Sequence, residues 1–211
     1  MNWMNDSDPL LKYREQHKHR LNYMPWLYWR LKEKNLSWAK RWQEEYQTYL
    51  QEMEDIEIGK NCFISPLAHI FAERGRKIRI GDNSFVAADA VLHGPLEIGD
   101  EVAINHHCTL DGGRAGICIG HQTRIAAYTH IYAFNHGMQQ KQAIYQQAVH
   151  SQGINIGRDV WIGADVGIVD GVHIGDKAVI AMNSVVTKAV ADYAIVAGNP
   201  ARVIGDRREK K

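Results

Sequence analysis

The 211-residue sequence predicts an all-β solenoid, a parallel β-helix of six coils, preceded by an N-terminal helical region. Two observations predict the solenoid: an aliphatic residue recurs every six positions from residue 56 onward, and an Ile-Gly pair opens every third repeat. A change of composition predicts the helical region, because residues 1–55 hold five of the six tryptophans. We therefore expect a helical region at 1–55, a β-helix domain at 56–206 with a long loop at 132–155, and a charged tail at 207–211.

The six-residue period decides the class of fold. It fits neither the period of two of a strand nor the period of 3.6 of a helix. It fits a coil with three short flat faces, each sending one aliphatic side chain inward, with neighbouring coils hydrogen-bonded at about 4.8 Å. One coil buries little, whereas a stack buries a continuous column. The column is Ile58, Ile64, Ile70, Ile80, Val86, Leu92, Ile98, Ile104, Leu110, Ile119, Ile125, Ile131, Ile156, Ile162, Ile168, Ile174, Ile180 and Val186.

A second column, four residues after each aliphatic, contains small side chains. Cys62 and Cys108 belong to it, so we expect both to be small buried hydrophobic groups. The exceptions are Arg74, Leu96, Arg114 and Asn135. Three of these four come before a repeat that arrives late, which predicts that the chain leaves the coil there as a loop.

The first 55 residues allow two interpretations. Pro25 is typical of a helix start, Asn35 of a helix end and Ser37 of the cap of a second helix. A stripe at helical spacing follows. One interpretation is a helical hairpin packed on the β-helix or at a subunit interface. The other is an amphipathic surface that docks on a membrane or on a lipid-linked substrate. The stripe is Trp38, Trp42, Tyr46, Tyr49, Leu50 and Met53.

The overall composition excludes several classes of protein. A formal net charge of +1 gives no global field that would favour nucleic acid. The first ten residues, MNWMNDSDPL, carry acids and no apolar core, so we expect no signal peptide. Three cysteines without CxxC spacing fit neither a disulfide framework nor a zinc knuckle. A cytoplasmic location is expected, with peripheral contact at the inner membrane face as an open alternative.

The largest interruption of the repeat locates the candidate active site. Ile131 and Ile156 are 25 residues apart where six are expected, and the loop between them begins YAFNHGM. Loops that leave a solenoid are where binding surfaces are built. His136 therefore stands at the root of a functional loop, and an imidazole with a pKa near 6.5 suits a general base.

At this point the sequence resembles the hexapeptide-repeat acyltransferases. The resemblance rests on the repeats, the Asn-His loop root, the segments INIGRDVWIGADVGIVDGVHIGDKAVI and NSVVTKAV, and the tail VAGNPARVIG. It covers about residues 56–206 and is strongest to the maltose, galactoside and bacterial surface-glycan O-acetyltransferases. It implies a left-handed β-helix, a homotrimer, and acetyl-CoA as co-substrate in a cleft between subunits, with no metal. It also implies acetyl transfer to a hydroxyl of a sugar or glycan in polysaccharide biosynthesis.

The same resemblance assigns roles to individual positions. It implies that His136 is the catalytic base in a direct transfer. Asn135, at the loop root, is expected to contact the substrate, as are two polar residues one coil earlier, Asn105 and Asp111. The residues expected at the coenzyme are Trp161, Gly163 and Ala164 of the VWIG motif and its successor, Thr187 and Lys188 of the VTK motif, and Arg202 of the tail.

One departure from the family pattern affects the coenzyme site. The family usually has Gly-Ala-Gly-Ser before the VTK motif, where a small side chain lets the pantetheine arm pass. This chain has Ala181-Met182-Asn183-Ser184 instead. Met182 is therefore expected to narrow or reshape that passage, with consequences for coenzyme binding and for acyl-chain length.

The sequence also leaves three other functions open. The first is N-acetyl transfer to an amino sugar or a sugar nucleotide, which the repeats do not distinguish from O-acetyl transfer. The second is a metalloenzyme like the γ-type carbonic anhydrases, which share the β-helix. Coil register is unfavourable for it within one subunit, because His106, His107, His121 and His130 do not stack on adjacent coils. The third is a non-catalytic scaffold, which would not need the loop histidine and the coenzyme motifs together.

Overall fold

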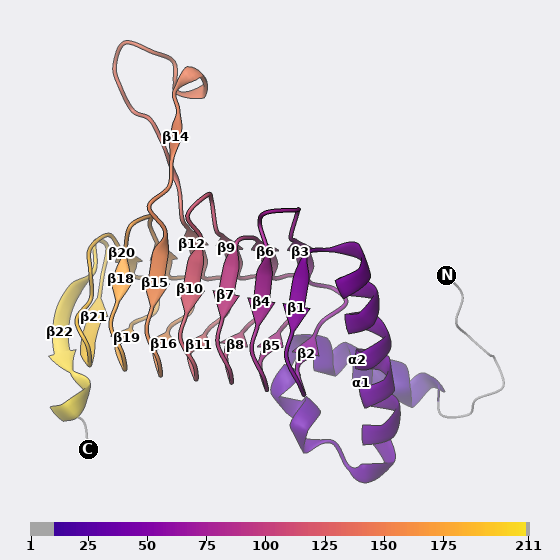
Figure 1. Ribbon diagram of the computed structural model, residues 1–211. Helices are drawn as coiled ribbons and strands as arrows, with labels where there is room; N and C mark the ends of the chain where they lie inside the picture. Colours follow the sequence, from indigo (N-terminus) through magenta and orange to yellow (C-terminus); the bar gives the residue numbers. More distant parts are fainter. Residues whose placement is uncertain (1–10, 210–211) are drawn as a thin grey trace.

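The computed structural model describes residues 11–209 (Figure 1). Trp3, the rest of the first ten residues and the last two residues of the tail lie outside that range. The structure confirms the predicted class, because a stack of parallel coils follows a helical region that packs at the first-coil end of the stack (Figure 1).

The coils stack their short strands into three sheets, A, B and C, that run along the solenoid. Neighbouring strands in them are parallel except β22, which pairs antiparallel with β21. Sheet A contains β1 (Ile56–Ile58), β4 (Ile78–Ile80), β7 (Leu96–Ile98), β10 (Ile117–Ile119), β15 (Ile154–Ile156) and β18 (His173–Ile174). Sheet B contains β2 (Phe63–Ile64), β5 (Phe85–Val86), β8 (Ala103–Ile104), β11 (Arg124–Ile125), β16 (Trp161–Ile162), β19 (Val179–Ile180), β21 (Ala194–Ala197) and β22 (Arg202–Asp206). Sheet C contains β3 (His69–Phe71), β6 (Val91–His93), β9 (Thr109–Asp111), β12 (His130–Tyr132), β17 (Gly167–Ile168) and β20 (Val185–Val186).

The register places the repeated aliphatics directly above one another. In sheet A, for example, Ile58 pairs with Ile80 and Ile80 pairs with Ile98. Almost all of the repeated aliphatics are buried, and they form one continuous core. Leu96, an unexplained exception in the sequence, is the first inward residue of β7 and pairs with Ile78. Strands of sheet A point two aliphatics inward, so a large residue fits there and a small one is not required.

The Ile-Gly pairs reflect how closely the coils approach at one corner. A Cβ on Gly81 would lie 2.4 Å from Oδ1 of Asp100 and 2.6 Å from the carbonyl carbon of Gly99 in the next coil. No real Cβ contact is that short, so a side chain at this position would push the coils apart. These glycines are therefore required by coil stacking.

The helical region begins and ends at residues different from those predicted. It contains α1 (Leu11–Tyr23), a short 3₁₀ helix η1 (Pro25–Arg30) and α2 (Glu33–Met53). Pro25 does open a helical turn, but Asn35 and Ser37 lie inside α2, so the predicted end and second start were wrong. The side chain of Asn35 accepts a hydrogen bond from Nε1 of Trp38 and lies 3.4 Å from His17 of α1. Asn35 thus serves the contact between the two helices and does not terminate one.

The helices cover the outer face of sheet B over the first coils. Gln43 of α2 donates to the carbonyl of Ile64 and accepts from its N–H, at 3.1 and 2.8 Å. The Trp42 and Phe63 rings pack edge to face with centroids 5.8 Å apart. The hydrogen bonds satisfy backbone groups at the open edge of the first coil, and the ring contact covers its apolar outer face. Both are expected for the cap of a solenoid. No helix among residues 11–209 has the length and apolar character needed to cross a membrane.

Candidate active site

The long loop leaves the solenoid after β12 and returns at β15, and it carries a two-stranded hairpin that rises from the coils (Figure 1). Its strands are β13 (Asn135–His136) and β14 (Val149–His150), with a 3₁₀ turn η2 (Ile144–Gln146) near the tip. Asn135 pairs with His150, and His136 pairs with Val149. The hairpin therefore fixes His136 on regular backbone at the base of the loop.

A serine joins the two ends of the loop. The Ser151 hydroxyl donates to the backbone oxygen of Ala133 at 2.5 Å, which connects the returning strand to the departing one. The Ser151 hydroxyl oxygen also accepts from the backbone N–H groups of Arg114 and Ala115, at 3.0 and 2.9 Å. One side chain thereby holds the loop to the preceding coil.

A buried carboxylate holds the return of the loop to the following coil. Asp170, which is only 8% exposed, accepts from the N–H groups of Gln152 and Gly153 at 2.9–3.0 Å. Gln147 secures the tip, because its amide donates to the carbonyls of Gln139 and Gln142 and accepts from the Gln139 N–H. The loop is therefore tied at its base and at its tip.

His136 is exposed and lines a cavity of about 550 Å³ on one side of the hairpin. Asn135, His150 and Asp170 line the same cavity. The Phe134 ring lies edge-on to the His136 ring, with centroids 6.3 Å apart. An accessible imidazole supported by an aromatic ring can accept a proton from a bound hydroxyl or amine.

A second cavity, of about 320 Å³, lies at the base of the hairpin beside Phe134 and Val149. Asp111 lines it, and its carboxylate accepts from the Gly113 N–H at 3.0 Å and lies 3.2 Å from Nδ1 of His93. Arg76 approaches the same carboxylate at 3.6 Å. Asp111 therefore has an oriented carboxylate that faces a cavity adjoining the loop.

The structure brings some of the expected site residues together and separates others. Asn135 and His136 share one cavity and Asp111 lines the next. Asn105 lines neither, and its side-chain amide donates to the backbone oxygen of Ile125 at 2.7 Å. It stands beside His106, whose pKa is lowered by burial and then by neighbouring His107.

The expected coenzyme residues lie on the last coils. Trp161, on the outer face of sheet B, is 58% exposed. Thr187 and Lys188 follow β20 of sheet C and are exposed, and exposed Arg202 begins β22 of sheet B. Exposed cations are suited to the phosphates of a coenzyme. Within one chain, however, these residues are distributed over two faces of the solenoid.

Gly163 and Met182 are in direct contact. A Cβ on Gly163 would lie 2.5 Å from the backbone nitrogen of Met182 and 2.9 Å from its Cα. The Gly163 carbonyl already accepts from the Thr129 hydroxyl at 3.0 Å, and its N–H donates to Ile180. The Met182 side chain is 62% exposed, so it projects from the corner beside Trp161 and Gly163 into solvent.

Sequence reasoning did not identify Ser151, Asp170 or Gln147 as parts of the site. Each acts through hydrogen bonds to backbone atoms, and such bonds leave no periodic signal. The sequence offered one signal for Asp170, namely the glycine that follows it, because glycine is typical of turns. In the structure Gly171 has a φ of +79°. Within residues 11–209, no group of three or more His, Cys, Asp or Glu side chains is arranged to hold a metal ion.

Comparison with known proteins agrees with the fold and the repeats. Residues 153–188 match the model of the hexapeptide repeat of succinyl-transferase. The chain is 38% identical over 122 residues to a probable macrolide acetyltransferase from Lysinibacillus sphaericus, a match that spans 56% of this chain and 67% of the relative. It is 30% identical to the galactoside O-acetyltransferase of Escherichia coli, over 72% of this chain and 64% of that protein. The chain thus spans about two thirds of the length of these relatives.

A solved structure of an acyltransferase is similar to this one. AntD, an N-acyltransferase from Bacillus cereus in complex with dTDP and 3-hydroxybutyryl-CoA, has a TM-score of 0.68 and 28% identity. The match covers 76% of this chain and 88% of AntD. Repeats, solenoid and sequence identity lead to one conclusion: the chain belongs to the hexapeptide-repeat acetyltransferases.

Proposed function

We propose that this protein transfers an acetyl group from acetyl-CoA to a hydroxyl of a sugar or glycan, with His136 as general base. The observation that carries the proposal is the exposed position of His136 on a hairpin tied at both ends and facing a cavity. A histidine with only a structural role would be expected to be buried or to bond to neighbouring backbone.

The chemistry follows from the groups at the site. A sugar hydroxyl is a poor nucleophile at neutral pH, and an imidazole that takes its proton during attack on a thioester carbonyl contributes about 10²–10⁴-fold. Binding both substrates in one cleft supplies a further large factor through proximity. The thiol of coenzyme A leaves as the acetyl ester forms, so the acetyl group need not pass through a serine or a cysteine. Asn135 and Asp111 are proposed to bind the acceptor.

The coenzyme is proposed to lie along the last coils, against Trp161, Gly163 and Ala164. The N–H of Ala164 makes no hydrogen bond to the described residues, whereas its carbonyl accepts from Asn183. That N–H is therefore available to a carbonyl of the pantetheine arm. Lys188 and Arg202, with Thr187 beside them, are proposed to bind the phosphates of coenzyme A. They lie on different faces, which favours a cleft shared between subunits of a homotrimer.

The acceptor is proposed to be a sugar unit used in cytoplasmic polysaccharide biosynthesis. The galactoside O-acetyltransferase of Escherichia coli supports a hydroxyl acceptor. A second function, transfer to the amine of a nucleotide-linked amino sugar, is favoured by AntD, which is an N-acyltransferase bound to dTDP. Both functions use the same loop histidine, because either nucleophile must lose a proton.

The decisive experiment measures release of free thiol from acetyl-CoA with a panel of acceptors. The panel contains maltose-like sugars, glycan repeat units, sugar nucleotides and amino-sugar nucleotides. Products are then treated with hydroxylamine, which cleaves acetyl esters and leaves acetamides intact. Acceptor-dependent thiol release with a cleavable product supports O-transfer, and a resistant product supports N-transfer. No thiol release with any acceptor would contradict the proposed function.

A further inference from the structure

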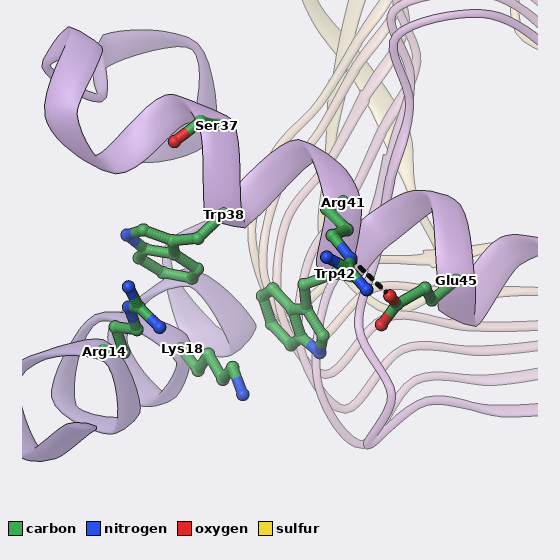
Figure 2. Close-up of a pocket in the computed structure, with 7 residues that line it drawn as sticks. All are labelled: Arg14, Lys18, Ser37, Trp38, Arg41, Trp42 and Glu45. Carbon is green, nitrogen blue, oxygen red and sulfur yellow. Dashed lines mark hydrogen bonds and ion pairs between the residues drawn. The ribbon is translucent and has the colours of Figure 1, made fainter. Parts of the chain in front are cut away.

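The helical region contains a groove between α1 and α2 that the proposed transfer reaction does not use. Figure 2 shows it, with the indoles of Trp38 and Trp42 along its floor and the side chains of Arg14, Lys18 and Arg41 around them. Its volume is about 560 Å³. The helices lie at the first-coil end of the solenoid, whereas the hairpin with His136 rises from a middle coil (Figure 1). A ligand in the groove would therefore leave the proposed active site open.

The aromatic floor offers a flat apolar surface. The Trp38 and Trp42 ring centroids are 6.4 Å apart and the planes differ by 38°. Both rings are half-buried, and the Nζ of Lys18 lies 5.5 Å from the centroid of Trp42. Indoles beside cations are suited to a ligand that has an apolar body next to an anionic group.

Lys18 and Arg41 keep most of their bonding capacity. Lys18 pairs with Glu15 at 2.8 Å and Arg41 pairs with Glu45 at 2.7 Å, each within its own helix. Arg41 and Glu45 are 80% and 64% exposed, and pairs of this kind contribute little to stability. A guanidinium has five N–H donors, of which Glu45 takes one. An incoming phosphate can therefore bind Arg41 and Lys18 without a large loss of existing interactions.

Charge is also segregated along the chain. Residues 11–45 carry nine lysines and arginines against four acids, whereas the whole chain carries 25 against 24. The segment 11–45, which forms the groove, therefore carries a local excess of five positive charges, which favours anions there.

We propose that the groove between α1 and α2 binds a phosphate group, with its charge against Lys18, Arg41 and Arg14 and its attached apolar or ring body against Trp38 and Trp42. The phosphate can be the headgroup of an anionic phospholipid or that of a soluble phosphate ester. The exposed side chain of Tyr13, which lines an adjoining cavity of about 300 Å³, extends the aromatic surface for a larger ligand.

Three probes distinguish the sources of phosphate. Sedimentation with phosphatidylglycerol vesicles tests a lipid headgroup, and titration with glycerol phosphate, followed calorimetrically, tests a soluble ester. Phosphatidylcholine vesicles, whose phosphate is neutralised by choline, are the negative control. We expect binding to one of the first two probes, weakening as salt is raised because the site is exposed.

The test variant is Lys18→Gln with Arg41→Gln, and its matched control is Lys60→Gln with Arg158→Gln. The control removes the same charge, including an arginine paired with a carboxylate (Asp176), but on the solenoid. We expect roughly thirtyfold weaker binding for the test variant, since each basic residue near an anionic surface contributes about a factor of five, and little change for the control. Thermal unfolding verifies that both variants fold.

Three results would overturn the proposal: no binding to either anionic probe, unchanged binding by the test variant, or equal loss in test and control variants. Thiol release from acetyl-CoA with a soluble acceptor is measured in parallel. It should be unaffected in the test variant, so a failed groove and a failed transferase assignment are distinguishable.

Discussion

The Ser151 hydroxyl and the backbone oxygen of Ala133 are 2.5 Å apart and join the two ends of the loop that carries His136. Ser151→Ala removes this bond and the acceptor of two further N–H groups. We expect a three- to thirtyfold lower kcat, because the base is held less firmly. The free energy of unfolding should fall by about 1–3 kcal/mol. Steady-state thiol release and chemical denaturation measure the two effects.

Ser84→Ala is the matched control for the effects of Ser151→Ala. Ser84 is buried in the solenoid, where its hydroxyl donates to the Gly99 carbonyl at 3.0 Å and accepts from the Val102 N–H at 2.9 Å. The same substitution there should lower stability and leave kcat unchanged. If both variants lower kcat to the same extent, the Ser151 effect is one of general destabilisation.

His136 and His150 line the same cavity, so each is tested as the base. His136→Ala should lower kcat at least about a hundredfold, the usual contribution of a general base. His150→Ala should cost less than tenfold, because His150 pairs with Asn135 across the hairpin and lies one position away from the base. A larger loss for His150→Ala than for His136→Ala would reverse the assignment.

The coils were predictable because their determinants are local and periodic. Each repeat buries one aliphatic, and the interruptions at residues 70, 110 and 131 correctly located the loops. Leu96 and the helix boundaries were not predictable in the same way. Leu96 is large because sheet A points two side chains inward, which depends on the neighbouring coils. The start of α2 at Glu33 overrides the capping tendency of Ser37, because Trp38 and Trp42 pack against neighbouring elements.

Some residues of the candidate site were likewise predictable from the sequence, and others were not. His136 was found because the loop interrupts a repeat, and Asp111 was expected from the resemblance to the family. Ser151 and Asp170 were missed because they bind backbone atoms from positions distant in sequence, such as Ala133 and Gly153. The role of Asn105 at the substrate stays a prediction; within this chain its side-chain amide donates to the backbone of the next coil.

The three cysteines should differ in reactivity. Burial raises the pKa of Cys62 to about 11 and that of Cys108 to about 12. Cys118 is exposed, and its pKa is raised less, by partial burial and then by Glu97. Because the thiolate is the reactive form, a disulfide reagent at pH 8 should label one thiol per folded chain, increasingly fast as the pH rises. Three thiols should react in denaturant, and none in folded Cys118→Ser. Labelling of that variant would show that the solenoid opens.

The contact between Gly163 and Met182 gives the last prediction. Gly163→Ala would place a methyl group 2.5 Å from the Met182 backbone nitrogen, so the coils must shift, and the free energy of unfolding should fall by roughly 1–3 kcal/mol. Gly167→Ala is the control, because its methyl group would meet nothing nearer than Val185 at 3.8 Å, and it should cost less than about 0.5 kcal/mol. Adding Met182→Ala to Gly163→Ala should not restore stability, since the clash is with backbone atoms. Restoration would mean that the exposed methionine side chain, and not coil stacking, requires glycine at position 163.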